Sequence, residues 1–297
     1  MEMKGFAGGF YRISEWIMRL SAINLLWLFC SLPVVFLTFL QLIAFMNMEE
    51  VGSILVLAFN PFALASLAIA PFTFFPATAA MFSVARKWVT GDADVPLFRS
   101  FFRYFKENYK VSLLGGLVFE LLYAVFLVNF QFYSSQQNWL GNLNLVFLVF
   151  LALLAAVALN YFCYVAHFDL PFRKLLRNSA LITVAKLPNT ISILVVNAAI
   201  LYISFKPRLM FLAIFFTGSV VALFTFWSFH RMITKIQEKM AELEDDEPAD
   251  AMNGDADRTA IAATEAEAAP AATGAPDRGL APGGAMKDEP RDGRAGS

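Results

Sequence analysis

Six long apolar stretches, separated by short polar segments, dominate the first 230 residues of the chain. They run over residues 20–45, 54–85, 112–132, 143–166, 189–205 and 209–229, and no Lys, Arg or Asp interrupts any of them. A helix needs about 20 apolar residues to cross the roughly 30 Å hydrocarbon layer of a bilayer. The pattern therefore predicts an all-α polytopic membrane protein with about six transmembrane helices.

The second apolar stretch is too long for one straight helix and contains Pro61, Pro71 and Pro76. Each proline lacks a backbone N–H and favours a kink or a break in a helix. Two paths for residues 54–85 stay open. The stretch is either one tilted, kinked helix or a broken helix with a short re-entrant piece.

Lys and Arg in the connecting segments indicate the orientation, because they concentrate on the cytoplasmic side. Sixteen of them lie in the N-terminal segment, in loops 86–111 and 167–188 and at the start of the tail, whereas the alternate segments hold only Lys206 and Arg208. Both termini are therefore predicted in the cytoplasm, a Nin–Cin topology.

Charge and composition divide the chain into two domains. Residues 1–240 hold 18 Lys and Arg against 10 Asp and Glu, whereas residues 241–297 hold 5 against 14 and are rich in Ala, Gly and Pro. We predict a helical transmembrane domain over 1–240, with its last helix fraying near residue 243. The segment 241–297 buries too little apolar surface to offset its ordering entropy, which predicts a disordered acidic tail.

Segment 97–110, LFRSFFRYFKENYK, predicts an amphipathic helix. At about 100° per residue, a basic stripe lies beside an arc of aromatic rings. The stripe consists of Arg99, Arg103, Lys106 and Lys110, and the arc consists of Phe98, Phe101, Phe102, Phe105 and Tyr109. Pro96 fits the start of this helix, with Asp94 as a candidate cap. Such a helix is expected to lie in the membrane interface, rings toward the apolar layer and charges toward anionic lipid phosphates.

Segment 169–187 repeats this pattern more weakly. Asp169-Leu170-Pro171 echoes the Asp-x-Pro at 94–96, and an Arg-x-x-x-Arg follows in both segments. An internal duplication is one explanation. Both helices are open to two interpretations, membrane anchoring or a docking surface for a cytoplasmic partner. Nucleic-acid binding is not expected, because loop orientation accounts for the basic residues.

Glu120 is the only acidic residue well inside an apolar stretch. It lies roughly 12 Å from the cytoplasmic edge at 1.5 Å per residue, and the small residues Gly116 and Ala124 share its helix face. We expect it to point into the bundle, with a neutral carboxyl that is hydrogen-bonded or faces a water-filled cavity. Asn160 and Asn197 are candidate partners at comparable depth. Polar glue between helices and solute or proton passage both stay open as roles.

Signatures of nucleotide, metal and catalytic chemistry are absent from the sequence. There is no G-x-x-x-x-G-K-[ST] phosphate loop and no G-x-S-x-G elbow. Cys30 and Cys163 lie inside apolar stretches. His167 and His230 lie about 60 residues apart, each near a cytoplasmic membrane edge and without a Cys, His or Asp cluster at metal-ligand spacing. We therefore expect no enzyme activity, no cofactor and no metal site.

Four motifs occur in a fixed order along the chain. They are Asn24-Leu25-Leu26-Trp27-Leu28 with Ser31-Leu32-Pro33, then Pro76-Ala77-Thr78-Ala79-Ala80-Met81, then Arg86-Lys87-Trp88, and finally Phe101-Phe102 through Lys106-Glu107-Asn108-Tyr109-Lys110. Together they resemble the YesL-like family of bacterial membrane proteins of unknown function. The long apolar insert between Pro33 and Pro76 and the acidic tail depart from the family pattern.

The resemblance implies a multi-pass protein of the bacterial cytoplasmic membrane. Family members often accompany sugar-uptake and polysaccharide-degradation genes, and no catalytic residues come with the family. The first hypothesis is a non-enzymatic protein accessory to carbohydrate uptake or utilisation, which contacts a sugar transport complex or a second copy of itself. The alternatives are a transporter in its own right and a membrane scaffold or sensor that uses the anionic lipids of the bilayer.

Overall fold

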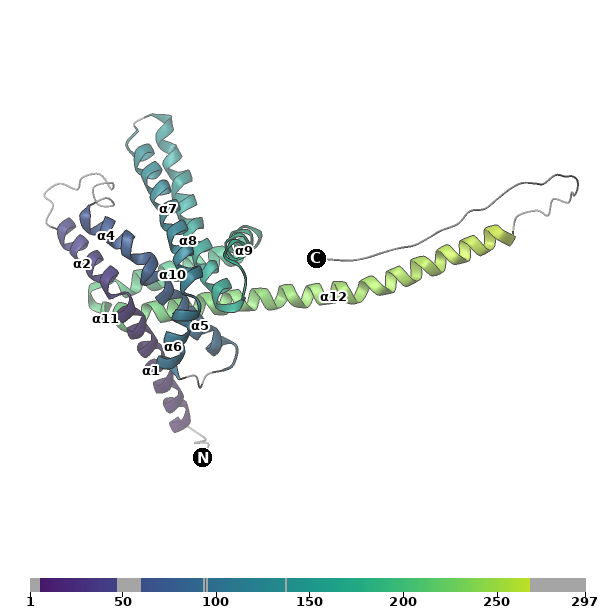
Figure 1. The fold of residues 1–297 in the computed structure, drawn as a ribbon, viewed down its shortest axis with the longest axis horizontal. Coiled ribbons are helices and arrows are strands. Elements are labelled where there is room, and N and C mark those ends of the chain that lie inside the picture. Colours follow the sequence, from purple (N-terminus) through teal and green to yellow (C-terminus); the bar gives the residue numbers. More distant parts are fainter. Residues whose placement is uncertain (1–5, 47–59, 93, 95, 137, 268–297) are drawn as a thin grey trace, which may run out of the picture. The chain divides into compact units, whose positions relative to one another are not determined.

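The computed structural model describes residues 6–46, 60–92, 94, 96–136 and 138–267. All regular secondary structure in these residues is helical (Figure 1). The longer helices are α1 (Phe6–Cys30), α2 (Leu32–Met46), α4 (Pro61–Ile69), α5 (Phe74–Val89), α6 (Leu97–Glu107), α7 (Tyr109–Ser134), α8 (Leu143–His167), α9 (Phe172–Ala185), α10 (Leu187–Ser204), α11 (Phe211–Phe215) and α12 (Thr217–Glu267). Short 3-10 turns are η1 (Ala70–Phe72), η2 (Trp139–Asn142) and η3 (Pro207–Leu209). The predicted all-α class is confirmed.

Several of these helices match the dimensions of a bilayer. Within the described residues, four spans are long and apolar enough to cross a membrane: Tyr11–Cys30, Tyr109–Ser134, Trp139–His167 and Leu187–Ser204. The bent pair Pro61–Phe72 and Phe74–Val89 gives a fifth if it forms one span. The described helices therefore include four or five candidate membrane-spanning segments, whereas the sequence predicted about six.

Two of the predicted stretches are interrupted. The first, 20–45, changes from α1 to α2 at Ser31, and the last, 209–229, changes from α11 to α12 at Phe216. Backbone hydrogen bonds still run across the first interruption, because Ser31 N donates to Trp27 O at 2.9 Å. The last stretch does not qualify as a span, because its apolar residues are divided between a five-residue helix and the start of α12.

The proline-rich second stretch is broken rather than straight. Pro61 occupies the first turn of α4, where Asn60 accepts a hydrogen bond from Ala63 N at 2.8 Å. Pro71 lies in the turn η1, and the two helical parts on either side meet at 46°. A straight helix is excluded, while a broken span and a re-entrant piece both fit this geometry.

Helix α5 forms the centre of the core. Every residue from 75 to 85 is buried, and α5 contacts α1, α6, α7 and α8. Ala77, Ala79 and Ala80 are completely inaccessible, and such small side chains allow close approach of neighbouring helices. Beside it, α7 and α8 run antiparallel as a hairpin (Figure 1).

The two basic segments have the same order of elements. A long helix, α5 or α8, is followed by a short helix, α6 or α9, whose N-cap is a proline, Pro96 or Pro171. One residue, Asn108 or Lys186, then separates the short helix from a long apolar one, α7 or α10. The echo seen in the sequence thus extends to the succession of helices.

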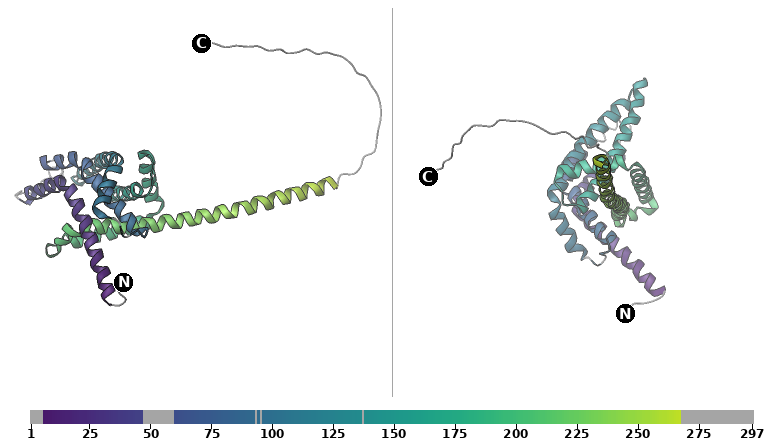
Figure 2. Two further views of the ribbon diagram at one scale, coloured as in Figure 1. Left: turned by 60° about the horizontal axis from the view of Figure 1, so that its bottom comes forward. Right: turned by 90° about the vertical axis from the view of Figure 1, so that its right-hand side faces the viewer.

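Helix α12 continues further than the sequence predicted. It is helical to Glu267 as one continuous element (Figure 2), past residue 243 and into the segment expected to be disordered. That expectation considered only the lack of a buried core, whereas Ala and Glu favour helix without one. The chain divides into two compact units, residues 1–238 and 239–297. The predicted disorder of residues 268–297 falls outside the described part of the chain.

Candidate functional site

Three of the four predicted basic residues lie exposed along α6: Arg99, Arg103 and Lys106. Lys110 does not belong to this helix. Helix α6 ends at Glu107, Asn108 separates it from α7, and Lys110 is the second residue of α7. Asn108 Nδ2 donates to Ser83 Oγ on α5 at 3.1 Å, which fixes this break against the core. The basic surface, defined here as Arg99, Arg103 and Lys106, therefore spans about two turns of one short helix.

One ring of the predicted aromatic face, Phe101, packs entirely on protein, while Phe102, Phe105 and Tyr109 are half-buried; the orientation of this face toward lipid stays a prediction. Phe101 has no exposed surface and Tyr104 is buried, whereas Phe98 remains 67% exposed. The reason is that α6 lies against α5 and α1, which offer the rings an apolar surface of the bundle itself. The most exposed ring of α6 is Phe98, which lies in its first turn.

Asp94 does not cap α6. The N-cap is Pro96, and no side chain bonds to the first turn. Asp94 Oδ1 instead accepts a hydrogen bond from Arg19 Nη2 at 2.7 Å, and Arg19 also pairs with Glu15 one turn earlier on α1. Asp94 thus ties the segment before α6 to α1, while the first N–H groups of α6 keep no partner within the helix.

Glu120 lies half-buried on α7. One turn earlier on the same face, a Cβ placed at Gly116 would lie 2.9 Å from the Phe75 ring and 3.1 Å from Pro71 Cα. Residues four apart share a helix face, so Glu120 lies on the side of α7 that approaches the break between α4 and α5. Among the described residues, the carboxyl makes no hydrogen bond and no ion pair.

The two asparagines predicted as partners of Glu120 bond elsewhere. Asn160 Nδ2 donates to Thr183 Oγ1 on α9 at 2.9 Å, and Asn197 Nδ2 donates to Thr225 Oγ1 on α12 at 2.8 Å. Both side chains are buried. Each asparagine therefore links its own helix to a neighbouring one. The bond gives the buried Nδ2 group a partner, and burial of that group without one would cost free energy.

A third buried asparagine, Asn24, holds the break between α11 and α12. Its Nδ2 donates to Ile214 O at 2.7 Å and its Oδ1 accepts from Ser219 N at 3.0 Å. A broken helix in an apolar layer must find partners for its freed backbone groups, and Asn24 supplies both kinds. Gly218 permits this approach, because a Cβ there would lie 2.8 Å from Asn24 Oδ1.

The sequence motifs that carry the family resemblance meet around α5. Trp27 Nε1 donates to Thr78 Oγ1 at 3.0 Å, which joins the first motif to Pro76-Ala77-Thr78-Ala79-Ala80-Met81. All six residues of that motif are buried. These motifs therefore encode helix packing, and the exposed groups of α6 lie at the edge of the core that they build.

The only two histidines of the chain come together, which their separation in sequence did not reveal. The rings of His167 and His230 have centroids 5.9 Å apart, and neither Nδ1 atom has a hydrogen-bond partner among the described residues. Phe226 stacks on His230, and Arg86 interacts electrostatically with His167. Within the described residues, no third His, Cys, Asp or Glu completes a metal-binding group here.

Residues 20–130 match the family model described as "Protein of unknown function, DUF624". The chain is similar to three uncharacterized proteins of Bacillus subtilis (strain 168). It is 28% identical to YteU over 203 residues, covering 68% of this chain and 76% of YteU. It is 29% identical to YesL over 217 residues, covering 73% of this chain and 86% of YesL.

The third relative, YesV, is 40% identical over 101 residues, which covers 33% of this chain and 48% of YesV. No solved structure matches the chain. The sequence relatives thus confirm the resemblance drawn from the motifs, and the matched segment includes α5, α6 and most of α7.

Proposed function

Because the chain resembles the YesL-like family, whose function is unknown, we propose its role from its own geometry. It is a non-enzymatic, multi-pass protein of the bacterial cytoplasmic membrane that acts through contact with a cytoplasmic-side partner. The partner is a sugar transport complex, to which the chain is accessory in carbohydrate uptake or utilisation. The family resemblance motivates the carbohydrate link, and the structure supplies the surface.

The supporting observation is the way in which α6 is held. Phe101 and Tyr104 are buried in the bundle, while Arg103 and Lys106 remain exposed. A helix that only anchored the chain to lipid would turn its aromatic face to the bilayer. A fixed row of positive charges instead suits an acidic protein surface, because complementary charge steers and orients association.

The contacts at the ends of the helices support the proposed Nin–Cin orientation. Arg19 of α1 bonds to Asp94 in the loop before α6, and His167 lies beside His230. The first contact joins the basic N-terminal segment to segment 86–111, and the second joins segment 167–188 to the start of the tail. Such contacts are expected if all four segments lie on one side of the membrane.

A photo-crosslinking residue at Lys106 in native membranes tests the proposal. We expect one discrete adduct that contains a carbohydrate-transporter subunit, and we expect Arg103→Glu to weaken it. The matched control places the same crosslinker at Asn138, between α7 and α8, where the predicted topology puts the opposite side of the membrane. Equal adducts at both positions, or an adduct of the chain with itself alone, would count against this function.

Transport by the chain itself is the second candidate, and Glu120 favours it. An acidic residue within a membrane-spanning helix that lies near a broken helix is typical of ion and solute pathways. Uptake of labelled sugars into vesicles that contain only the purified chain would support this candidate. Glu120→Gln retains the shape but cannot ionise, so it should abolish such uptake without loss of folded protein.

A further inference from the structure

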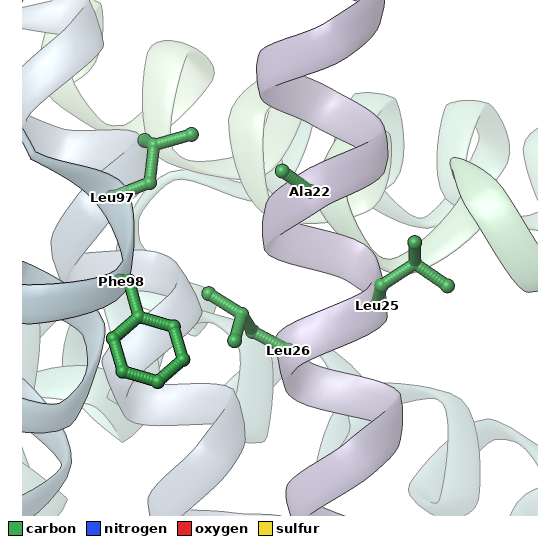
Figure 3. Close-up of a pocket in the computed structure, with 5 residues that line it drawn as sticks. All are labelled: Ala22, Leu25, Leu26, Leu97 and Phe98. Carbon is green, nitrogen blue, oxygen red and sulfur yellow. The ribbon is translucent and has the colours of Figure 1, made fainter.

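An apolar groove lies between α1 and the start of α6. It has a volume of about 330 Å³ and is lined by Ala22, Leu25, Leu26, Leu97 and Phe98 (Figure 3). Figure 3 shows the side chains of Leu26 and Phe98 approaching each other across it. None of the five side chains carries a polar atom, and Phe98 and Leu25 remain 67% and 41% exposed. The groove is open and accepts an apolar occupant.

The two groove-lining residues of α6 are followed along the chain by a positive charge. Leu97 and Phe98 are the first two residues of α6, and no side chain caps that end. Arg99 follows them, exposed and, within the described part of the chain, without an ion pair or side-chain hydrogen bond. Its neighbour Arg103, by contrast, contacts Glu107 at 3.8 Å and Tyr104 Oη at 3.0 Å. Arg99 and Lys106 are therefore the cations of α6 that are free to bind an anion, and Arg99 is the one next to the groove-lining residues in the chain.

The two carboxylates nearest the start of α6 share one partner, Arg19. Asp94, two residues before the N-cap, is paired with Arg19, and Arg19 also bonds to Glu15. The uncapped N–H groups add the positive end of the helix dipole to the charge of Arg99. An anion beside Arg99 would be attracted by this side chain and by the helix end, and an apolar chain attached to that anion would enter the groove.

We propose that this groove binds one acyl chain of an anionic phospholipid, with the lipid phosphate against Arg99 and the N-terminus of α6. A peptide fits less well, because the all-carbon lining would leave its backbone N–H and C=O groups unpaired. A neutral lipid would leave Arg99 without a counter-charge. The site goes beyond the proposed function: it uses the first turn of α6, whereas partner docking is tested at Lys106.

Native mass spectrometry and thermal unfolding of the purified full-length chain in mild detergent test the site. Phosphatidylglycerol is expected to remain bound as one copy and to raise the unfolding temperature. Phosphatidylcholine should bind roughly fivefold more weakly, the ratio that corresponds to about 1 kcal/mol per charge near an anionic lipid. Glycerol 3-phosphate, which offers the phosphate without an acyl chain, should have no effect.

Three variants separate the parts of the site. Arg99→Gln should remove the preference for phosphatidylglycerol over phosphatidylcholine, and Ala22→Phe should reduce retention of both by filling the groove. Phe98→Ala removes one wall at an exposed position, so it keeps a folded chain available if Ala22→Phe fails to fold. Arg173→Gln, at the matching position of α9, is the control and should bind lipid like the wild type.

Several outcomes would overturn the site. These are equal binding of both phospholipids by the wild type, full stabilisation by glycerol 3-phosphate, and unchanged selectivity in Arg99→Gln. The first indicates a generic lipid contact, and the second a free-phosphate site. Because the assay contains the purified chain alone, a failure to crosslink a partner at Lys106 would leave its result unaffected.

Discussion

The short helices α6 and α9 begin alike. Each follows an Asp-x-Pro sequence, each has the proline as its N-cap, and each carries an Arg-x-x-x-Arg in its first two turns. Their exposed faces also begin alike, with Arg99 and Arg103 on α6 and Arg173 and Arg177 on α9. A reader of the sequence alone would assign them one role.

Their buried faces differ. α6 buries the rings of Phe101 and Tyr104, whereas α9 buries Leu175 together with Ser179 and Thr183. The α6 contact is dominated by apolar area, which is non-directional. The α9 contact includes a hydrogen bond from Asn160 of α8 to Thr183, and Thr190 of α10 donates to Thr183 O at 2.7 Å. The same pattern of exposed arginines therefore lies over an apolar contact in α6 and over a contact with buried hydrogen bonds in α9.

The second halves of their outward faces differ as well. α9 exposes Leu181 and Val184 after its basic start, at 59% and 64%, a pattern suited to lipid hydrocarbon. α6 continues instead with the exposed Lys106 and Glu107. The comparison teaches that α9, which is held partly by buried hydrogen bonds, exposes apolar side chains, whereas α6, which is anchored by buried aromatic rings, exposes charged ones.

Phe101→Ala should have the largest effect, because it removes the completely buried ring that anchors α6. Truncation of a buried Phe costs about 3–5 kcal/mol in soluble proteins. We expect a loss of that order in chemical or thermal unfolding in detergent without added lipid. Phe98→Ala, three residues away and largely exposed, should cost far less. Equal losses in the two variants would contradict the assigned buried face of α6.

Thr183→Val should destabilise the chain by about 1–3 kcal/mol. Valine keeps the shape but leaves the buried Asn160 amide without its acceptor, and an unsatisfied buried polar group carries that penalty. Thr183→Ser keeps the hydroxyl and should recover much of the loss. Thermal unfolding of both variants gives the measurement. If Val is tolerated as well as Ser, the hydrogen bond does not hold α9.

The uninterrupted apolar runs could be predicted from the sequence because each is a local feature. Stretches 112–132, 143–166 and 189–205 lie within or nearly within α7, α8 and α10. The break at Phe216 could not be predicted in this way. No glycine or proline stands at that residue, and the break is satisfied by Asn24, which lies some 190 positions earlier in the chain.

The sites show the same division between local and distant information. Helical periodicity predicted the basic stripe of α6, but it cannot tell whether an aromatic face meets lipid or protein, since both are apolar. The placement of Asp94 was wrong because its partner, Arg19, lies on another helix. The His167–His230 pair likewise depends on the packing of α8 against α12. The sequence shows which residues carry a carboxyl or an imidazole, whereas the fold determines which residues those groups contact.

Lys106→Gln and Lys174→Gln test the feature that α6 and α9 share. Each residue is exposed, and each is expected near the cytoplasmic membrane surface. A basic side chain there contributes about 1 kcal/mol of attraction to anionic lipid. Both variants should lose about that much of the extra stability found in anionic relative to neutral nanodiscs, and high salt should remove the difference. A loss for Lys106 alone would place the start of α9 away from the lipid surface.

Asp94→Asn and Asp169→Asn should have the smallest effects, and they test whether the two Asp-x-Pro sequences serve one purpose. Asp94 bonds to Arg19 at 2.7 Å, but its own side chain is 94% exposed, and such solvent-exposed pairs contribute less than about 1 kcal/mol. Arg19 keeps Glu15 as a partner when Asp94 is neutralised, so no charge is left alone. Asp169 is exposed and makes no ion pair with any described residue, so its substitution should change nothing.

We expect a small loss of unfolding free energy for Asp94→Asn, removed by high salt and absent from an Arg19→Gln background. A loss well above 1 kcal/mol that persists in salt would show that Asp94 holds the start of α6 by more than this ion pair. An equal loss at Asp169 would show that the carboxylate serves the Asp-x-Pro turn itself in both helices.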